Sequence, residues 1–171
     1  MASATIPVVA PPLIAGIDYS TVALDVALVR GRQLISIETY RLGADLDVQV
    51  GVISRLMSSL CSKDVAVVVM EERWARVEKG LPTAMKIRDV STRVETLAAV
   101  AGLETVWVPV NKWHMHILGN GGLRSEAAKQ ASLIYAERVY GLKDVSHNQA
   151  DAICIATWGA VTALQRALAT A

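Results

Sequence analysis

Three acidic residues occupy positions from which their carboxylates could bind a hard metal ion. Asp18 ends the apolar run "LIAGI", Glu71 ends the apolar run "VAVVVM", and Asp151 lies in "HNQADAICIA", in the first turn of a predicted helix. Taken singly they have ordinary explanations: a turn-initiating aspartate, a solvated strand end and an acid favoured by a helix dipole. Taken together, closely spaced carboxylates repel one another unless a cation intervenes, and Mg²⁺ held by a few carboxylates can share a phosphate.

Basic residues gather directly after Glu71. Between positions 73 and 93 the chain has six Lys or Arg residues and two acids, whereas its formal net charge is only +1. The small net charge argues against a global field that attracts polyanions or membrane surfaces. The chain is therefore cationic only locally, next to a candidate metal ligand.

The order of the predicted elements decides whether the three acids can meet. Apolar and branched residues predict three consecutive strands, and the two-residue link "GR" forces the second and third into an antiparallel hairpin. A helix, a strand buried on both faces, a second helix and a fifth strand follow, so that strand, helix and strand form a parallel crossover. The predicted strands are 13–20, 21–30, 33–42, 64–71 and 104–110, and the predicted helices are 47–63, 82–101, 111–118, 124–141 and 148–169.

This order is that of the α/β ribonuclease H-like fold, a mixed five-stranded sheet of three antiparallel strands and then two parallel strands, flanked by helices. The first and fourth strands are neighbours in this topology, so we expect Asp18 and Glu71 to lie within a few ångströms of each other. Topology alone does not give function.

The helix after the cationic segment carries an apolar stripe, which predicts packing onto the sheet or, alternatively, a dimer seam. Its members are Ile87, Val90, Val94, Leu97 and Ala101.

Length and composition predict one domain over residues 12–171, preceded by a flexible leader over residues 1–11. The chain has 171 residues, of which 53% are apolar, which is enough for a core. Three prolines and the lack of a positive start argue against a signal peptide, and no run of ~18 apolar residues could span a membrane. Cys61 and Cys154 lack metal-ligand spacing, so we expect a reduced intracellular protein.

Four segments together carry a resemblance to a known family. "GIDYS", "VVMEERW", "VPVNKWHMHILGNGGLRSEAAKQA" and "HNQADAICIATWGA", in that order and at those separations, resemble the RuvC family of Holliday junction resolvases, particularly its phage-type members. The resemblance extends from about Leu13 to Ala163. It implies an endonuclease that resolves four-way DNA junctions in recombination and repair, as a homodimer whose twofold symmetry matches the junction. It also implies a cytoplasmic location, with the nucleoid or in a phage-infected host.

The resemblance assigns Asp18, Glu71 and Asp151 as ligands of two Mg²⁺ ions, for which Mn²⁺ would substitute. Two such ions about 3.5 to 4 Å apart can activate a water and stabilise the leaving oxygen of a phosphodiester. Glu72 points to the other side of its strand by the period of two, so it ranks second.

The fourth ligand departs from the family pattern. Family members carry Asp or His three residues before the final aspartate, where this chain has Asn148, preceded by His147. Both positions face Asp151 on a helix. We expect Asn148 to be the helix N-cap, which leaves His147 as ligand or proton carrier, with Asn148 as an amide-oxygen ligand as the alternative. A capping role for both would weaken the catalytic case.

The resemblance also implies a set of DNA contacts. Trp74 matches an aromatic residue that inserts at the junction, although it could instead pack under its loop, and the basic residues would contact phosphates without reading sequence. The loop "GNGG" resembles the family's loop near the scissile strand and is not a P-loop. His114 and His116 are interpreted as surface histidines rather than zinc ligands. The candidate DNA-binding residues are Arg73, Trp74, Arg76, Lys79, Lys86, Arg88, Lys112, Arg124 and Lys129.

Two other functions remain open. The first is a nuclease of the same fold that acts on flaps, forks or RNA in hybrids. The second is a nucleic-acid-binding or processing factor without catalysis, which the missing acid at Asn148 favours. An actin-type nucleotide-binding protein also starts with a "GID" strand, but it needs a duplicated half that 171 residues cannot hold.

Overall fold

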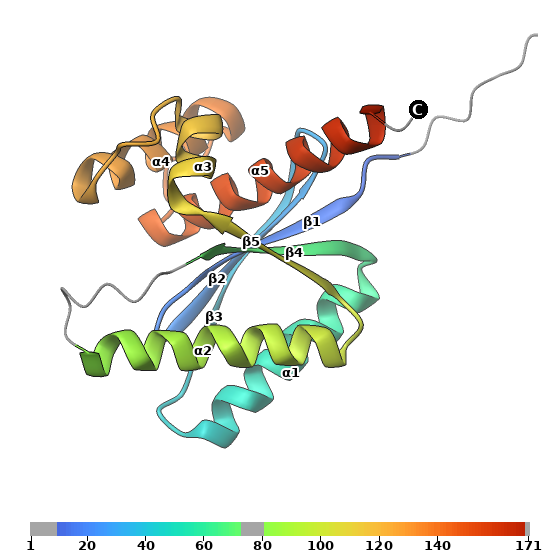
Figure 1. Cartoon of the computed structure of the whole chain (residues 1–171), viewed down its shortest axis with the longest axis vertical. Helices are drawn as coiled ribbons and strands as arrows, with labels where there is room; N and C mark the ends of the chain where they lie inside the picture. The colour runs from blue at the N-terminus through green and yellow to red at the C-terminus, as the bar shows by residue number, and fades with distance from the viewer. Residues whose placement is uncertain (1–9, 73–80, 170–171) are drawn as a thin grey trace, which may run out of the picture.

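A mixed sheet forms the centre of the molecule (Figure 1). The computed structural model describes residues 10–72 and 81–169, and these residues form a five-stranded sheet of order β3-β2-β1-β4-β5. β1 pairs antiparallel with β2 and β2 with β3, whereas β1, β4 and β5 run parallel. The predicted fold class is therefore confirmed. The strands are β1 (Leu13–Tyr19), β2 (Ala23–Arg30), β3 (Gln33–Arg41), β4 (Val65–Glu72) and β5 (Glu104–Pro109).

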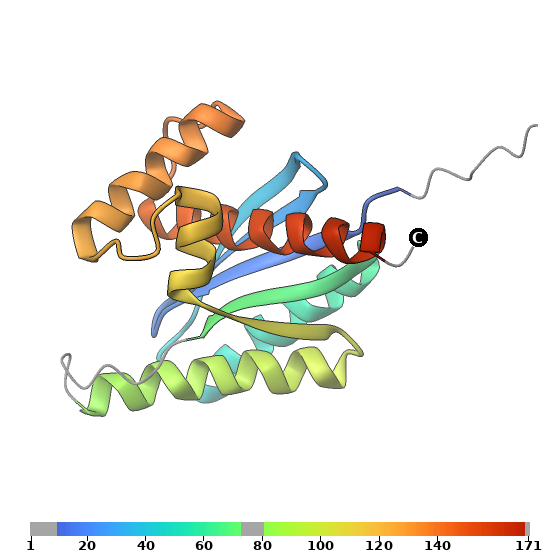
Figure 2. The same ribbon diagram turned by 45° about the horizontal axis from the view of Figure 1, so that its top comes forward.

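Helices cover both faces of the sheet (Figures 1 and 2). α1 (Leu46–Ser62) and α2 (Leu81–Val100) lie on one face. α5 (His147–Ala169) lies on the other, together with α3 (Val110–Trp113), the π-helical segment η2 (His114–Leu118) and α4 (Ser125–Tyr140). No helix in the parts of the chain that the structure describes is long and apolar enough to cross a membrane.

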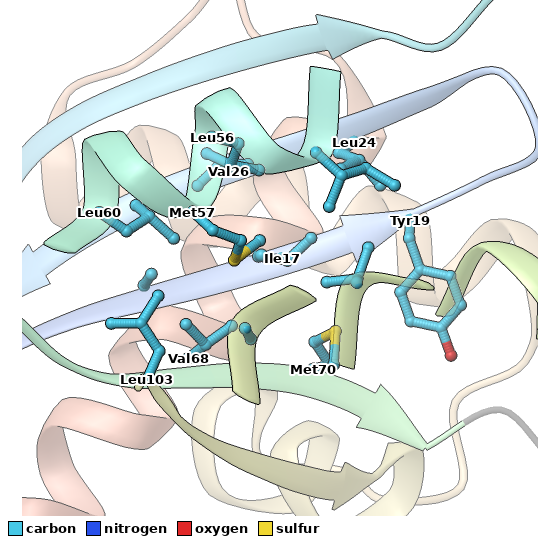
Figure 3. Close-up of a cluster of buried hydrophobic side chains, with 14 of the residues drawn as sticks. Ile17, Tyr19, Leu24, Val26, Leu56, Met57, Leu60, Val68, Met70 and Leu103 are labelled. Carbon is cyan, nitrogen blue, oxygen red and sulfur yellow. The ribbon is translucent and has the colours of Figure 1, made fainter. Parts of the chain in front are cut away.

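One hydrophobic core lies between the sheet and the helices α1 and α2 (Figure 3). Ile17 and Met70, from neighbouring strands, are fully buried there. Val90 and Val94 of the α2 stripe are also buried, so packing onto the sheet is confirmed, and these two side chains cannot form a dimer seam. The predicted leader falls largely on residues 1–9, outside the described residues.

On the opposite face, α5 lies almost directly against β1. A Cβ atom on Gly16 would lie 2.3 Å from the backbone nitrogen of Ala156 and 2.5 Å from the carbonyl oxygen of Ala152, so only glycine permits this contact. Small residues on the helix, including Ala152 and Ala156, make the approach possible from the other side. The start of α5 is thereby brought over the carboxyl end of β1, where Asp18 lies.

Candidate active site

Asp18 and Glu71 lie side by side at the carboxyl ends of two neighbouring parallel strands. Ile17 is the register partner of Met70, and each acid is the next residue along its strand. Since side chains alternate between faces, Asp18 points to the same face as Gly16, and Glu71 points to the same face as Val69, which packs in the α5 layer. Both acids therefore face α5.

Asp18 lies within β1 rather than in a turn, and only 4% of its surface is exposed. The turn after β1 is formed by Ser20, whose Oγ accepts hydrogen bonds from the backbone nitrogens of Val22 and Ala23 and donates to the carbonyl of Ala23. A turn-initiating role for Asp18 is thus wrong.

Two side chains fix the position of Glu71. The indole Nε1 of Trp113 donates to its Oε2 at 3.0 Å, and the hydroxyl of Tyr19 donates to its carbonyl oxygen at 3.0 Å. Both donors are almost completely buried. Sequence reasoning did not single out Trp113, because its contact with Glu71 joins α3 to the end of β4, 42 positions away in the sequence. Glu72 follows Met70 on the α1 and α2 side by alternation, as predicted.

The start of α5 differs from the prediction in two respects. The helix begins at His147, and Ser146 forms a capping box with Gln149: the Gln149 backbone nitrogen donates to Ser146 Oγ at 3.2 Å, and the Ser146 nitrogen donates to Gln149 Oε1 at 3.0 Å. The prediction that Asn148 is the N-cap is therefore wrong. Asp151 lies one residue beyond the first turn, so the helix-dipole explanation for it also fails.

The capping box leaves Asn148 inside the helix, half-buried like Asp151, while His147 is exposed. Residues three and four positions apart share a helix face, so Asn148 and His147 both lie next to Asp151. Asp151 is close enough to Cys154 that its negative charge, after burial as the main cause, raises the pKa of that thiol. Cys154 is fully buried and is therefore no candidate nucleophile.

A second buried acid, Asp25 of β2, was missed by the sequence reasoning. It is the register partner of Asp18 and is also only 4% exposed. Thr39 of β3 donates a hydrogen bond from Oγ1 to Asp25 Oδ1. Its signal was present in the sequence, because "ALDVALVR" has an acid in the middle of an otherwise buried apolar strand.

The donor set at this end of the sheet fits a hard divalent cation. Asp18, Glu71 and Asp151 offer carboxylate oxygens, the ligands that Mg²⁺ and Mn²⁺ prefer, and no sulfur competes because Cys154 is protonated and buried. Within residues 10–72 and 81–169, no group of three or more His, Cys, Asp or Glu side chains is arranged to hold a metal ion. The strand register makes Asp18 and Glu71 neighbours, but the described residues do not form a closed set of metal ligands.

Comparison with solved structures relates the fold to two resolvases. RuvC of T. thermophilus, in complex with a Holliday junction substrate, has a TM-score of 0.72 with this chain at 20% identity, over 91% of this chain and 95% of that chain. The Fowlpox virus resolvase, in complex with Holliday junction DNA, has a TM-score of 0.51 at 8% identity, over 89% of this chain and 99% of that chain. The fold is that of RuvC. No protein-family model and no curated protein matches the sequence.

Only part of the candidate DNA surface of this RuvC-like fold can be placed. Arg73, Trp74, Arg76 and Lys79 lie outside the described residues. The five remaining candidate DNA-binding residues lie on the surface and form two groups, one on each side of the sheet. Lys86 and Arg88 are exposed on α2, near its start; on the α5 side, Lys112 and Arg124 are exposed and Lys129 is half-buried.

The loop 119–122 follows η2, which contains the two histidines, on the α5 side of the sheet. A Cβ on Gly121 would lie 2.8 Å from the carbonyl oxygen of Asn111, so this glycine permits a close backbone contact. His116 is exposed, as predicted, but His114 is only 5% exposed and lies edge-on against Trp113, with ring centroids 4.1 Å apart. The interpretation of His114 as a surface residue is therefore wrong.

Proposed function

We propose that this protein is a metal-dependent endonuclease that resolves four-way DNA junctions in recombination or repair. The observation that carries the proposal is the position of Asp18 and Glu71 at adjacent strand ends facing the start of α5, on a RuvC fold. The two similar resolvases are described in complex with Holliday junctions, which supports the same substrate class here. A protein of this kind works where the DNA is, in the cytoplasm with the nucleoid or with phage DNA.

The catalytic residues of the proposal are Asp18, Glu71, Asp151 and His147. The first three would hold divalent ions, with His147 or Asn148 completing the set. Bound Mg²⁺ or Mn²⁺ would lower the pKa of a water and stabilise the charge on the leaving oxygen. His147 is exposed at the start of α5, so it would be in a position to carry a proton between the site and solvent.

The remaining contacts hold the substrate. Exposed Lys86, Arg88, Lys112 and Arg124, with Lys129, would contact phosphates on both sides of the sheet, and such contacts position DNA without reading its sequence. We assign the same role to Arg73, Arg76 and Lys79, and to Trp74 the role of stacking on a base at the junction centre. A homodimer would present two active sites to the two equivalent strands of the junction.

A cleavage assay with labelled substrates tests this function. A synthetic four-way junction, a fork, a flap, an RNA–DNA hybrid and a linear duplex are incubated with the protein in Mg²⁺, Mn²⁺ or EDTA. We expect paired nicks in the junction, dependent on the divalent ion, and little cutting of linear duplex. Preferential cutting of forks, flaps or hybrids would favour the other nuclease function, and binding without cleavage in either metal would favour a non-catalytic factor.

The variant Asp18→Asn separates binding from chemistry. The change removes a negative charge from the proposed metal ligands and leaves the basic surface intact. We expect cleavage to be lost while junction affinity, measured by gel shift in EDTA, stays within about twofold of wild type, since phosphate contacts supply that affinity. Retained cleavage would remove Asp18 from the catalytic set.

A further inference from the structure

A chain of side-chain hydrogen bonds connects the middle of β2 to the start of α5. Asp25 Oδ1 accepts a hydrogen bond from Thr39 Oγ1, and Thr39 Oγ1 accepts one from Gln149 Nε2 at 3.1 Å. Gln149 closes the chain through its own amide oxygen, which accepts from the backbone nitrogen of Ser146 at 3.0 Å. The contact between Thr39 and Gln149 joins residues 110 positions apart in the sequence.

The direction of each bond follows from the number of protons available. A threonine hydroxyl has a single proton, and here Thr39 donates it to Asp25. The hydroxyl oxygen can then only accept from Gln149, so the amide nitrogen of Gln149 must face Thr39. Its amide oxygen must in turn face Ser146, which is the orientation that the capping box needs.

This series of hydrogen bonds ends at the part of α5 that carries the proposed ligands. Gln149 lies one residue after Asn148 and two residues before Asp151. Asp25, at the other end, is the register partner of Asp18. The hydrogen bond between Thr39 and Gln149 thereby links the first turn of α5 to the strands next to Asp18.

We infer that Asp25, Thr39 and Gln149 form a tether that positions Asp151 and Asn148 against Asp18 for metal binding. The inference rests on the proposed function, since it concerns the same metal site. The three residues are positioning residues and do not touch the metal. The bond between Asp25 and Thr39 is partly buried, and the bond between Thr39 and Gln149 is exposed. In the inference they serve as the outer contacts that orient ligands in metal sites, whose loss weakens metal affinity about 10–100-fold.

Substitution at Thr39 gives the first test. Thr39→Val keeps the shape and removes the hydroxyl, whereas Thr39→Ser keeps the hydroxyl. The control is Tyr40→Phe, which removes another side-chain hydrogen bond from the same strand, the one from Tyr40 to Glu38 Oε2 at 2.8 Å. We expect Thr39→Val to weaken Mn²⁺ binding by the free protein, measured by electron paramagnetic resonance, about tenfold. Thr39→Ser and Tyr40→Phe should bind Mn²⁺ like wild type.

Gln149→Glu tests the tether apart from the helix cap. Glutamate retains the acceptor that completes the capping box, but it cannot donate to Thr39. We expect it to weaken Mn²⁺ binding as Thr39→Val does. Wild-type Mn²⁺ affinity in both Thr39→Val and Gln149→Glu would overturn the inference.

Asp25→Asn separates a tether from a direct metal ligand. The Oδ1 of asparagine still accepts the Thr39 proton, so we expect an Mn²⁺ affinity close to wild type. A tenfold loss in this variant would overturn the positioning role and make Asp25 a ligand beside Asp18.

Hydrogen exchange distinguishes failure of the tether from failure of the proposed function. If the wild-type protein binds no Mn²⁺, the proposed metal site fails and the metal-positioning inference fails with it. Amide exchange in the first two turns of α5 then still reports on the tether itself. We expect those amides to exchange faster in Thr39→Val than in Tyr40→Phe, and equal rates would show that no tether exists.

Discussion

Glu71 illustrates how single contacts prepare this site. A carboxylate at a strand end is normally mobile, but here an indole nitrogen and a tyrosine hydroxyl hold its side chain and its backbone. A hydrogen bond to a charged group contributes about 1.5–3 kcal/mol, enough to select one side-chain orientation. Trp113 is thus a positioning residue for a proposed ligand.

Trp113→Phe tests that role. The ring stays in the core while the donor to Glu71 is lost, so we expect the rate of junction cleavage to fall about 10–100-fold with little change in junction binding. Trp107→Phe is the matched control, because it loses a comparable bond, from Trp107 Nε1 to Glu95 Oε1 at 2.9 Å, at an exposed place. Equal cleavage rates in the two variants would contradict the assignment.

The thiol of Cys154 provides a pH-dependent prediction at the same scale. Burial, with the nearby charge of Asp151, raises the pKa of this thiol above its ordinary value of 9.0. The raised pKa favours the protonated thiol in the folded state, so its contribution to stability is present below pH 9.0 and is lost as the pH rises above it. In a Cys61→Ser background we expect native protein to resist alkylation by iodoacetamide at pH 8 to about 9. Rapid labelling of folded protein there would contradict the burial of Cys154.

The contact between α5 and β1 is the element-scale feature on which the site depends. Gly16 faces backbone atoms of α5, which cannot move individually, whereas a Cβ on Gly159 would meet side-chain atoms of Val69 and Ile14 at 2.7 and 2.8 Å. Side-chain atoms can adjust by small rotations, while helix backbone can only move as a unit. The two glycines should therefore respond differently to the same substitution.

Gly16→Ala and Gly159→Ala form a matched pair for this reason. We expect Gly16→Ala to lower the free energy of unfolding by about 3 kcal/mol, at the upper end of overpacking costs, and to reduce cleavage because α5 carries Asp151. Gly159→Ala should cost less, about 1 kcal/mol. Urea denaturation measures both. A Gly16→Ala protein as stable as wild type would show that α5 does not lie against β1 in this way.

The same scale shows what the sequence could and could not predict. Periodicity predicted the strands and the packing of Val90 and Val94, whereas the neighbouring positions of Asp18 and Glu71 were predicted from the analogy with the ribonuclease H-like topology. The capping residue was misplaced because Ser146 and Asn148 are both good N-caps, and only the hydrogen bonds to Gln149 decide between them. His114 was misplaced because the lack of zinc-ligand spacing was taken to indicate a surface histidine, whereas its ring lies edge-on against the buried Trp113.

Contacts between distant residues were beyond such reasoning. The bonds from Trp113 to Glu71 and from Gln149 to Thr39 depend on strand register and helix placement, neither of which local patterns specify. The β2–β3 register also shifts between Leu28 and Val29, and Thr39 faces Asp25 only in the register that holds from Ala23 to Leu28. An acid in the middle of β2 was the one local sign of the tether.

At the scale of the whole molecule, the proposal requires two copies acting on one junction. The buried side chains of the α2 stripe, Val90 and Val94, already pack against the sheet of their own protomer. A dimer would therefore have to use exposed side chains, such as Leu81 and Met85 of α2. A symmetric junction must be cut on two equivalent strands, and one protomer has a single candidate site. Under the proposed function, coordinated cutting would therefore depend on assembly of two protomers and not on one site alone.

Mixed dimers test this coordination. Wild-type protein mixed with an excess of Asp18→Asn protein should mainly nick a cruciform-bearing supercoiled plasmid, whereas wild type alone should linearise it, because each mixed dimer has one intact site. The two products separate on an agarose gel. Linear product at an undiminished yield with a large excess of the variant would show that one protomer makes both cuts.

The central claim is that Asp18, Glu71 and Asp151, which lie far apart in the sequence, share bound divalent ions. A crystal of the protein soaked in Mn²⁺ and measured at the manganese absorption edge tests it most directly. The account predicts anomalous peaks between the carboxylates of these three residues, at oxygen–metal distances of about 2.0 to 2.2 Å, the range for small hard divalent cations. At saturating Mn²⁺, the claim would be contradicted by anomalous peaks found only at other places. It would also be contradicted by the absence of any peak between the three carboxylates.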